Sequence, residues 1–201
     1  MTVGADEPVP VDGEGTGANQ PRGEQGVAGA ATASAPAERE RLTGRIAFPV
    51  AEFGPGELVC LNNFGGRSTA RGVCGHRGVD IGVDVGGLAP HPLVACVDGV
   101  IESIGSTGSS GRYVILFGDD GRWYRYHHLS AYADGLDEGL RVAVGDTLGL
   151  MGTSGNTSWR HLHFEVWVDS VIPRDGIALD PVPLMPIPGA VRLAAASGCG
   201  G

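Results

Sequence analysis

The sequence lacks the features that mark membrane, exported and nucleic-acid-binding proteins. No run of about 18 apolar residues occurs in the chain, so we expect no membrane span. The first residues contain no basic segment followed by an apolar run, so we expect no classical signal peptide. The net charge is −9, which disfavours contact with DNA or RNA phosphates, so we expect no nucleic-acid partner.

Paired cysteines and helical patterns are absent as well. The four cysteines, at positions 60, 74, 96 and 199, form no Cys-x-x-Cys pair, which argues against a cysteine-based zinc site. Cys60 and Cys74 flank a glycine-rich loop and could form a disulfide or remain two thiols. No segment has a clean helical apolar period, and the His-Glu-x-x-His motif of helix-borne zinc sites is missing.

Composition divides the chain into three parts. Residues 1–42 are expected to form a flexible Gly/Ala/Pro-rich arm, because residues 1–41 contain no Leu, Ile, Phe, Trp or Tyr. Such a segment cannot bury enough apolar surface to offset the entropy lost on ordering, unless a virion or another assembly partner holds it. We predict a folded domain over residues 43–185 and a C-terminal tail over residues 186–201.

The folded part is predicted to be all-β or β-dominated. The 35 glycines indicate many turns, which suit short strands better than helices. Residues 112–117 and 122–129 flank Gly118-Asp119-Asp120-Gly121, a strong hairpin signal. Residues 131–141 are expected to form a short helical turn, which Gly135 and Gly139 weaken.

One segment combines a strand pattern with two imidazoles. Polar residues at 161, 163 and 165 alternate with apolar residues at 162, 164, 166 and 168, which is the period of a half-buried strand. His161 and His163 are therefore expected on one face of the strand. Taken alone, such a pair is more typical of a solvated strand face than of a site.

A second segment makes a metal site the better interpretation. His76 and Asp80 are four residues apart, with Gly78 between them to allow a tight bend. Imidazoles and a carboxylate suit a tetrahedral zinc site with an open fourth position. His127 and His128 are adjacent near the end of a predicted strand, where alternation would direct them to opposite faces, so only one could face a given groove.

At these residues the chain resembles the lysostaphin-type, or LytM-like, zinc metalloendopeptidases of bacterial peptidoglycan. Their pattern is His-x-x-x-Asp, Tyr-x-His-Leu-Ser and His-x-His-Phe-Glu, which is found here at residues 76–80, 126–130 and 161–165. Looser similarity extends the resemblance over about residues 43–185. It implies an antiparallel sheet with a loop-lined groove.

The resemblance also implies residue roles. His76, Asp80 and His163 would bind one Zn²⁺ ion, while His128 and His161 would flank the activated water and the scissile carbonyl. One of these two histidines would accept a proton and the other would stabilise the oxyanion; the sequence leaves open which does which.

Other residues near the motifs have weaker expected roles. His127 is expected to point away from the groove as a structural or exposed residue, and Glu165 to orient a ligand. Tyr113 and Tyr126 could donate to the oxyanion or simply pack. Trp159 could stack on substrate or pack on its own domain; it lies where the family commonly has Gly-Pro before His-x-His.

The expected function is a zinc endopeptidase that cuts peptide cross-links of peptidoglycan. It would act on the cell wall, either outside the cytoplasm or delivered by a phage as an endolysin or tail-associated lysin. The arm and the missing signal peptide motivate the phage hypothesis. The alternatives are a non-catalytic wall-binding or structural assembly component, and a zinc carboxypeptidase that releases D-Ala.

Overall fold

A computed structural model describes residues 44–66, 75–84, 90–170, 172 and 175–195. The predicted arm, Cys74 and Cys199 lie outside these residues, as does the end of the predicted tail, and the proposed docking role of residues 1–41 stays a prediction. Within the described parts all regular elements are strands, which confirms the predicted β class. The same parts include no helix with the length and apolar character needed to cross a membrane.

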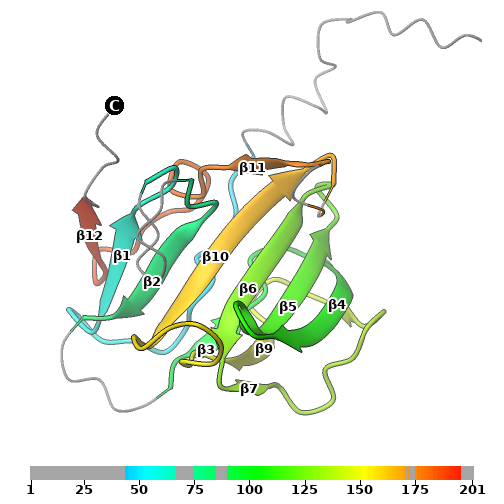
Figure 1. Ribbon diagram of the computed structural model, residues 1–201, viewed down its shortest axis with the longest axis horizontal. Coiled ribbons are helices and arrows are strands. Elements are labelled where there is room, and N and C mark those ends of the chain that lie inside the picture. Colours follow the sequence, from blue (N-terminus) through cyan, green and yellow to red (C-terminus); the bar gives the residue numbers. More distant parts are fainter. Residues whose placement is uncertain (1–43, 67–74, 85–89, 171, 173–174, 196–201) are drawn as a thin grey trace, which may run out of the picture. The chain divides into compact units, whose positions relative to one another are not determined.

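In the part of the chain that the structure describes, twelve strands form two sheets (Figure 1). In chain order they are β1 (Leu58–Asn62), β2 (Val79–Val83), β3 (Pro92–Val94), β4 (Gly99–Thr107), β5 (Gly111–Gly118), β6 (Trp123–Leu129), β7 (Ala131–Tyr132), β8 (Arg141–Val142), β9 (Thr147–Leu150), β10 (His161–Val168), β11 (Ile177–Leu179) and β12 (Arg192–Ala195). The larger sheet has the order β12-β1-β2-β10-β6-β5-β4-β8, with β11 paired to β10, and the smaller sheet has the order β3-β9-β7.

Strand β10 lies at the centre of the larger sheet, between β2 and β6 (Figure 1). Both pairings are antiparallel, and they place His163 opposite Asp80 on one side and opposite His127 on the other. Leu162, Phe164 and Val166 are fully buried, as the alternation predicts. Burial of each such side chain stabilises the fold by about 1.5–3 kcal/mol.

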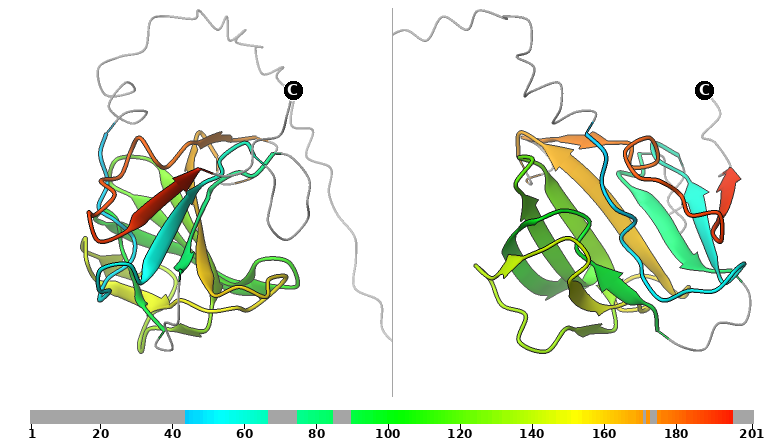
Figure 2. Two further views of the ribbon diagram at one scale, coloured as in Figure 1. Left: turned by 90° about the vertical axis from the view of Figure 1, so that its left-hand side faces the viewer. Right: turned by 180° about the vertical axis from the view of Figure 1, so that it is seen from behind.

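The smaller sheet packs on one face of the larger one (Figure 2). Its Leu93 and Leu148 share a core with Phe164 and Leu116 of the larger sheet. Tyr126 on β6 links the two sheets, because its hydroxyl donates to Val94 O at 3.0 Å and accepts from Cys96 N at 3.1 Å. One face of β10 is therefore core, and the opposite face carries the histidines.

Two segments outside the histidine cluster differ from the sequence-based expectations. Residues 131–141 contain β7 and turns instead of a helical turn, because Gly135 and Gly139 have φ angles of 76° and 82°, which a right-handed helix does not allow. The sheet also continues into the segment predicted as a tail, since β12 pairs in parallel with β1.

Two described cysteines are buried thiols. Cys60 and Cys96 are free, and burial raises the pKa of each to about 12. Both thiols therefore remain protonated and unreactive at neutral pH.

Candidate metal centre

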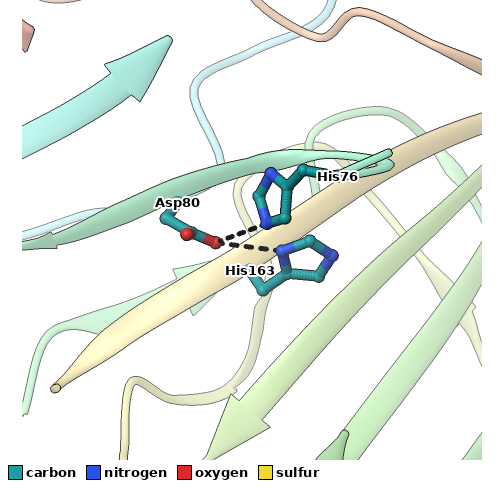
Figure 3. Close-up of side chains that lie close together, drawn as sticks. All are labelled: His76, Asp80 and His163. Atoms are coloured by element: carbon teal, nitrogen blue, oxygen red, sulfur yellow. Dashed lines mark hydrogen bonds and ion pairs between the residues drawn. The ribbon is translucent and has the colours of Figure 1, made fainter. Parts of the chain in front are cut away.

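His76, Asp80 and His163 converge on the face of β10 that points away from the core (Figure 3). Asp80 Oδ1 lies 3.3 Å from His76 Nε2 and 2.9 Å from His163 Nδ1. One potential ligand atom from each residue lies within 4.8 Å of the others, a separation that one metal ion can bridge. The structure thus brings together the three residues that the sequence predicts as ligands.

Gly78 allows the two strands to approach closely enough. A Cβ atom on Gly78 would lie 2.1 Å from the carbonyl oxygen of Phe164, a distance that real Cβ atoms do not show. The backbone between His76 and Asp80 therefore runs directly against β10. The sequence predicts the glycine as a bend, whereas its structural role is this close approach.

Asn63 holds the carboxylate of Asp80. The Asn63 side-chain amide donates to Asp80 Oδ2 at 2.9 Å, and the Asp80 backbone N–H donates to Asn63 Oδ1 at 3.2 Å. These bonds orient Asp80 so that Oδ1 faces the imidazoles. Sequence reasoning missed Asn63, which is 2% exposed, because a polar residue close to the glycines at 65 and 66 gives no sign of burial.

Glu165 fixes the orientation of His163 from the other side. Its Oε1 accepts from His163 Nε2 at 2.9 Å, and its Oε2 accepts from Trp167 Nε1 at 2.7 Å and forms an ion pair with Arg125 Nη1 at 3.2 Å. This arrangement directs His163 Nδ1 toward Asp80. Glu165 thus lies where its predicted orienting role requires.

The charges around His163 favour a cation at this position. Burial alone would lower the pKa of His163, but hydrogen bonds to Asp80 and Glu165 raise it to about 9. Burial alone would raise the pKa of Asp80, but hydrogen bonds from His163 and His76 hold it well below its usual range. Two carboxylates therefore surround one imidazole that is protonated at neutral pH.

The donor set fits a zinc ion that replaces this proton. Asp80 Oδ1 has a third imidazole nitrogen nearby, His161 Nε2 at 3.5 Å. His161 Nδ1 lies 2.9 Å from the carbonyl oxygen of Trp159, which can only accept, so Nδ1 carries the hydrogen and Nε2 carries a lone pair. The lone pair of His161 Nε2 faces a carboxylate oxygen, which is unfavourable unless a positive charge lies nearby. A zinc ion would supply that charge, and the two imidazoles and one carboxylate of His76, His163 and Asp80 are ligands that zinc prefers.

His128 and His161 present neutral imidazoles beside this cluster. Their ring centroids are 4.8 Å apart, and His128 Nδ1 donates to the carbonyl oxygen of Ser154 at 2.8 Å. Burial lowers the pKa of His128 to about 4 and also lowers the pKa of His161. Both imidazoles are therefore able to accept a proton at neutral pH.

The predicted orientation of His127 is wrong. His127 lies opposite His163 in the β6–β10 pair and therefore shares its face, with ring centroids 5.3 Å apart. His128, whose centroid is 6.3 Å from that of His163, reaches the same neighbourhood because its φ of 66° breaks the alternation at a register shift between β5 and β6. His127 is buried, and burial holds its pKa well below its usual value.

The three residues with predicted substrate roles have different surroundings. Tyr126 is fully buried between the sheets, so the expectation that it contacts substrate is wrong, and packing decides its position. Tyr113 is half-buried, with its ring 6.3 Å from that of His127. Trp159 packs on its own domain, stacked on His161.

Comparisons with known proteins agree with this geometry. Residues 74–181 match the family described as peptidase family M23. The chain is 32% identical over 96 residues, or 48% of its length, to the peptidoglycan DD-endopeptidase ShyC of Vibrio cholerae. It is 33% identical over 114 residues, or 55% of its length, to the glycyl-glycine endopeptidase ALE-1 of Staphylococcus capitis.

These relatives are much longer proteins, since the matched regions span only 21% and 29% of them. Among solved structures, a protein of Ruminococcus gnavus assigned to the glycyl-glycine endopeptidase lytM is similar, with a TM-score of 0.58 and 24% identity. That match covers 73% of this chain and 61% of the other. At this level of identity the match supports the fold alone.

Proposed function

Because the chain belongs to peptidase family M23, we propose that it is a zinc-dependent endopeptidase that hydrolyses peptide cross-links of bacterial peptidoglycan. His76, Asp80 and His163 would hold the ion, and His128 and His161 would perform proton transfer. The name of the relative ShyC supports a peptidoglycan substrate, and the names of both relatives support endopeptidase activity. The site of action would accordingly be the cell wall.

Zinc, when bound, would polarise the scissile carbonyl and lower the pKa of a coordinated water molecule to about 7. The residues of the chain contribute the remaining chemistry. His161 and His128 are held as neutral tautomers by the carbonyl groups of Trp159 and Ser154, so each can accept a proton. The imidazole that becomes protonated can then donate to the oxyanion or to the leaving amine.

One observation carries the proposal. Three imidazoles, two from β10 and one from His76 before β2, approach a single oxygen of Asp80, and a fourth, His128, lies beside them. A structural zinc site would need a fourth protein ligand, whereas the donor group found among the described residues has three members, as catalytic sites do. A non-catalytic relative would be expected to have lost part of this set.

The proposal is tested by digestion of purified peptidoglycan followed by mass spectrometry of the released muropeptides. We expect cross-linked dimers to decrease and monomers to increase, a chelator to stop the reaction, and added zinc to restore it. Undiminished cleavage after complete zinc removal would contradict the proposal. Release of terminal D-Ala without loss of cross-links would support a carboxypeptidase instead.

The same digest identifies the bond. The relatives include a DD-endopeptidase and a glycyl-glycine endopeptidase, so their names do not agree on the cross-link. Parallel digestion of directly cross-linked and glycine-bridged peptidoglycan separates the two activities, because each substrate contains only one of the two bonds at its bridge.

A further inference from the structure

The indole of Trp159 lies against His161 on the face of β2. The two rings are nearly parallel, with 13° between their planes and 4.8 Å between their centroids. The indole Nε1–H donates to the carbonyl oxygen of Val83 at 3.0 Å. The indole is therefore fixed by this hydrogen bond as well as by the contact between the rings.

Gly82 provides the space that the indole occupies. Gly82 lies opposite His161 in the β2–β10 pair. A Cβ atom at this position would lie 2.3 Å from Trp159 Cζ2 and 2.7 Å from His161 Cβ. Any other residue would displace the indole or separate the strands, so Trp159 rests directly on the backbone of β2.

The backbone of Trp159 also determines which nitrogen of His161 carries the hydrogen. Its carbonyl oxygen accepts from His161 Nδ1 at 2.9 Å. Thr157 holds the same residue in place, since its hydroxyl accepts from Trp159 N and donates to Trp159 O, both at 3.2 Å. If the imidazole rotated, the bond to Trp159 O would break and the preference for one tautomer would be lost.

We infer that Trp159 is a positioning residue that holds His161 in the rotamer and tautomer in which Nε2 faces Asp80. The inference rests on the proposed function of His161 in proton transfer. It assigns Trp159 an effect through His161 rather than through contact with substrate. Only the remaining half-exposed edge of the indole is available to anything else.

The test compares Trp159→Ala with Trp159→Phe, which keeps an aromatic face but loses the indole N–H. In zinc-free protein, long-range ¹⁵N–¹H spectra of His161 should show one Nδ1–H tautomer in the wild type and in Trp159→Phe, and averaged nitrogen shifts in Trp159→Ala. With zinc, kcat of Trp159→Ala on a cross-linked muropeptide should fall by about 10–100-fold, because a misplaced catalytic group is that costly. KM and zinc affinity should change by less than about twofold, since neither depends on the imidazole of His161.

Trp123→Ala is the matched control. Trp123 is also half-buried and packs against an aromatic ring, that of Phe117, with 4.7 Å between centroids and 38° between ring planes, but it lies at the other end of the β6–β10 pair. Its removal should reduce stability and leave the His161 spectrum and kcat unchanged. If Trp159→Ala does not fold, Trp159→Leu replaces it, because leucine fills volume without offering an aromatic face.

Three outcomes would overturn the inference. The first is a single His161 tautomer in Trp159→Ala, and the second is an unchanged kcat in that variant. The third is a loss confined to KM, which would make Trp159 a substrate contact. If the proposed function were wrong, the wild-type protein itself would lack zinc-dependent cleavage. The spectra of the zinc-free protein would still show whether Trp159 holds His161 in one tautomer.

Discussion

At the residue scale, the candidate centre depends on how two carboxylates are held. Asp80 is oriented by Asn63, and Glu165 orients His163, so each side of the cluster has a supporting partner. Such partners typically change metal affinity by 10–100-fold when they are removed. Their effects can therefore be measured without removing any proposed ligand.

Asn63→Ala should weaken zinc binding by about 10–100-fold while the protein remains folded, because Asp80 loses the amide that orients it. Competition with a chromophoric chelator measures the change. Asn62→Ala is the matched control, since Asn62 is the exposed neighbour at the end of β1. Equal affinities for the two variants would show that the amide bond does not support the site.

Zinc binding should release about one proton from His163 at pH 7. The pKa of His163 in the zinc-free protein is about 9, and zinc must displace the proton, so apparent affinity should rise with pH and level off above about 9. Calorimetry in buffers of different ionisation enthalpy counts the released protons. Proton release near zero at pH 7 would contradict the assignment of His163 as a ligand.

The same shift affects the stability of the zinc-free protein. Folding raises the pKa of His163, so the protonated imidazole contributes to the free energy of unfolding. This contribution is fully present below the unfolded pKa of about 6.5 and is lost as the pH rises through the folded pKa of about 9. Zinc and this proton occupy the same position. The loaded protein should therefore be less sensitive to pH over that window.

At the scale of elements, the site is a product of the β2–β10 pairing. Gly78→Ala should reduce the free energy of unfolding by about 1–3 kcal/mol or more, because its Cβ would meet the backbone of β10. It should also impair zinc binding, since His76 and Asp80 would move together away from His163. Chemical denaturation and zinc titration measure the two effects.

Gly108→Ala provides the comparison for this variant. Gly108 lies in the β4–β5 turn, and a Cβ there would meet nothing within 4 Å. Its substitution should leave stability within about 0.5 kcal/mol and zinc binding unchanged. If Gly78→Ala behaved in the same way, the close approach of the two strands would not matter for the site.

Strands β10 and β6 show which features of the site could be predicted from the sequence and which could not. The alternation in residues 161–168 predicted which side chains of β10 face the core and that His161 and His163 share the other face. It did not predict that this second face is also covered, since every residue of β10 except the partly buried His163 is buried. The face of His127 could not be predicted, since the left-handed conformation of His128 arises where β6 meets β5. The choice between substrate contact and packing for Tyr126 could not be made either, since its hydroxyl partners lie on β3 of the other sheet and just after it.

At the scale of the whole molecule, zinc should stabilise the fold by mass action. Ligands from two segments distant in the sequence bind the ion only when both segments are in place, so a zinc concentration 100 times Kd should contribute about 2.7 kcal/mol. For a chain of this length that corresponds to a rise in Tm of about 5–10 °C.

Thermal unfolding with and without zinc checks this expectation, and His163→Ala should abolish the rise. His91→Ala is a control for general histidine–zinc contacts, because His91 is also buried but hydrogen-bonds Glu52 O and is not part of the cluster. An equal rise in Tm for both variants would place the stabilising ion elsewhere.

The proposed ligands come from two distant parts of the chain, the segment of His76 and β2 on one side and β10 on the other, and this has a consequence for synthesis of the protein. A ribosome releases His76 and Asp80 more than eighty residues before His163. A growing chain, or a fragment cut between these strands, therefore cannot assemble the cluster however well its first half folds. Hydrolytic capacity would therefore appear only after His163 has been synthesised and β10 has paired with β2.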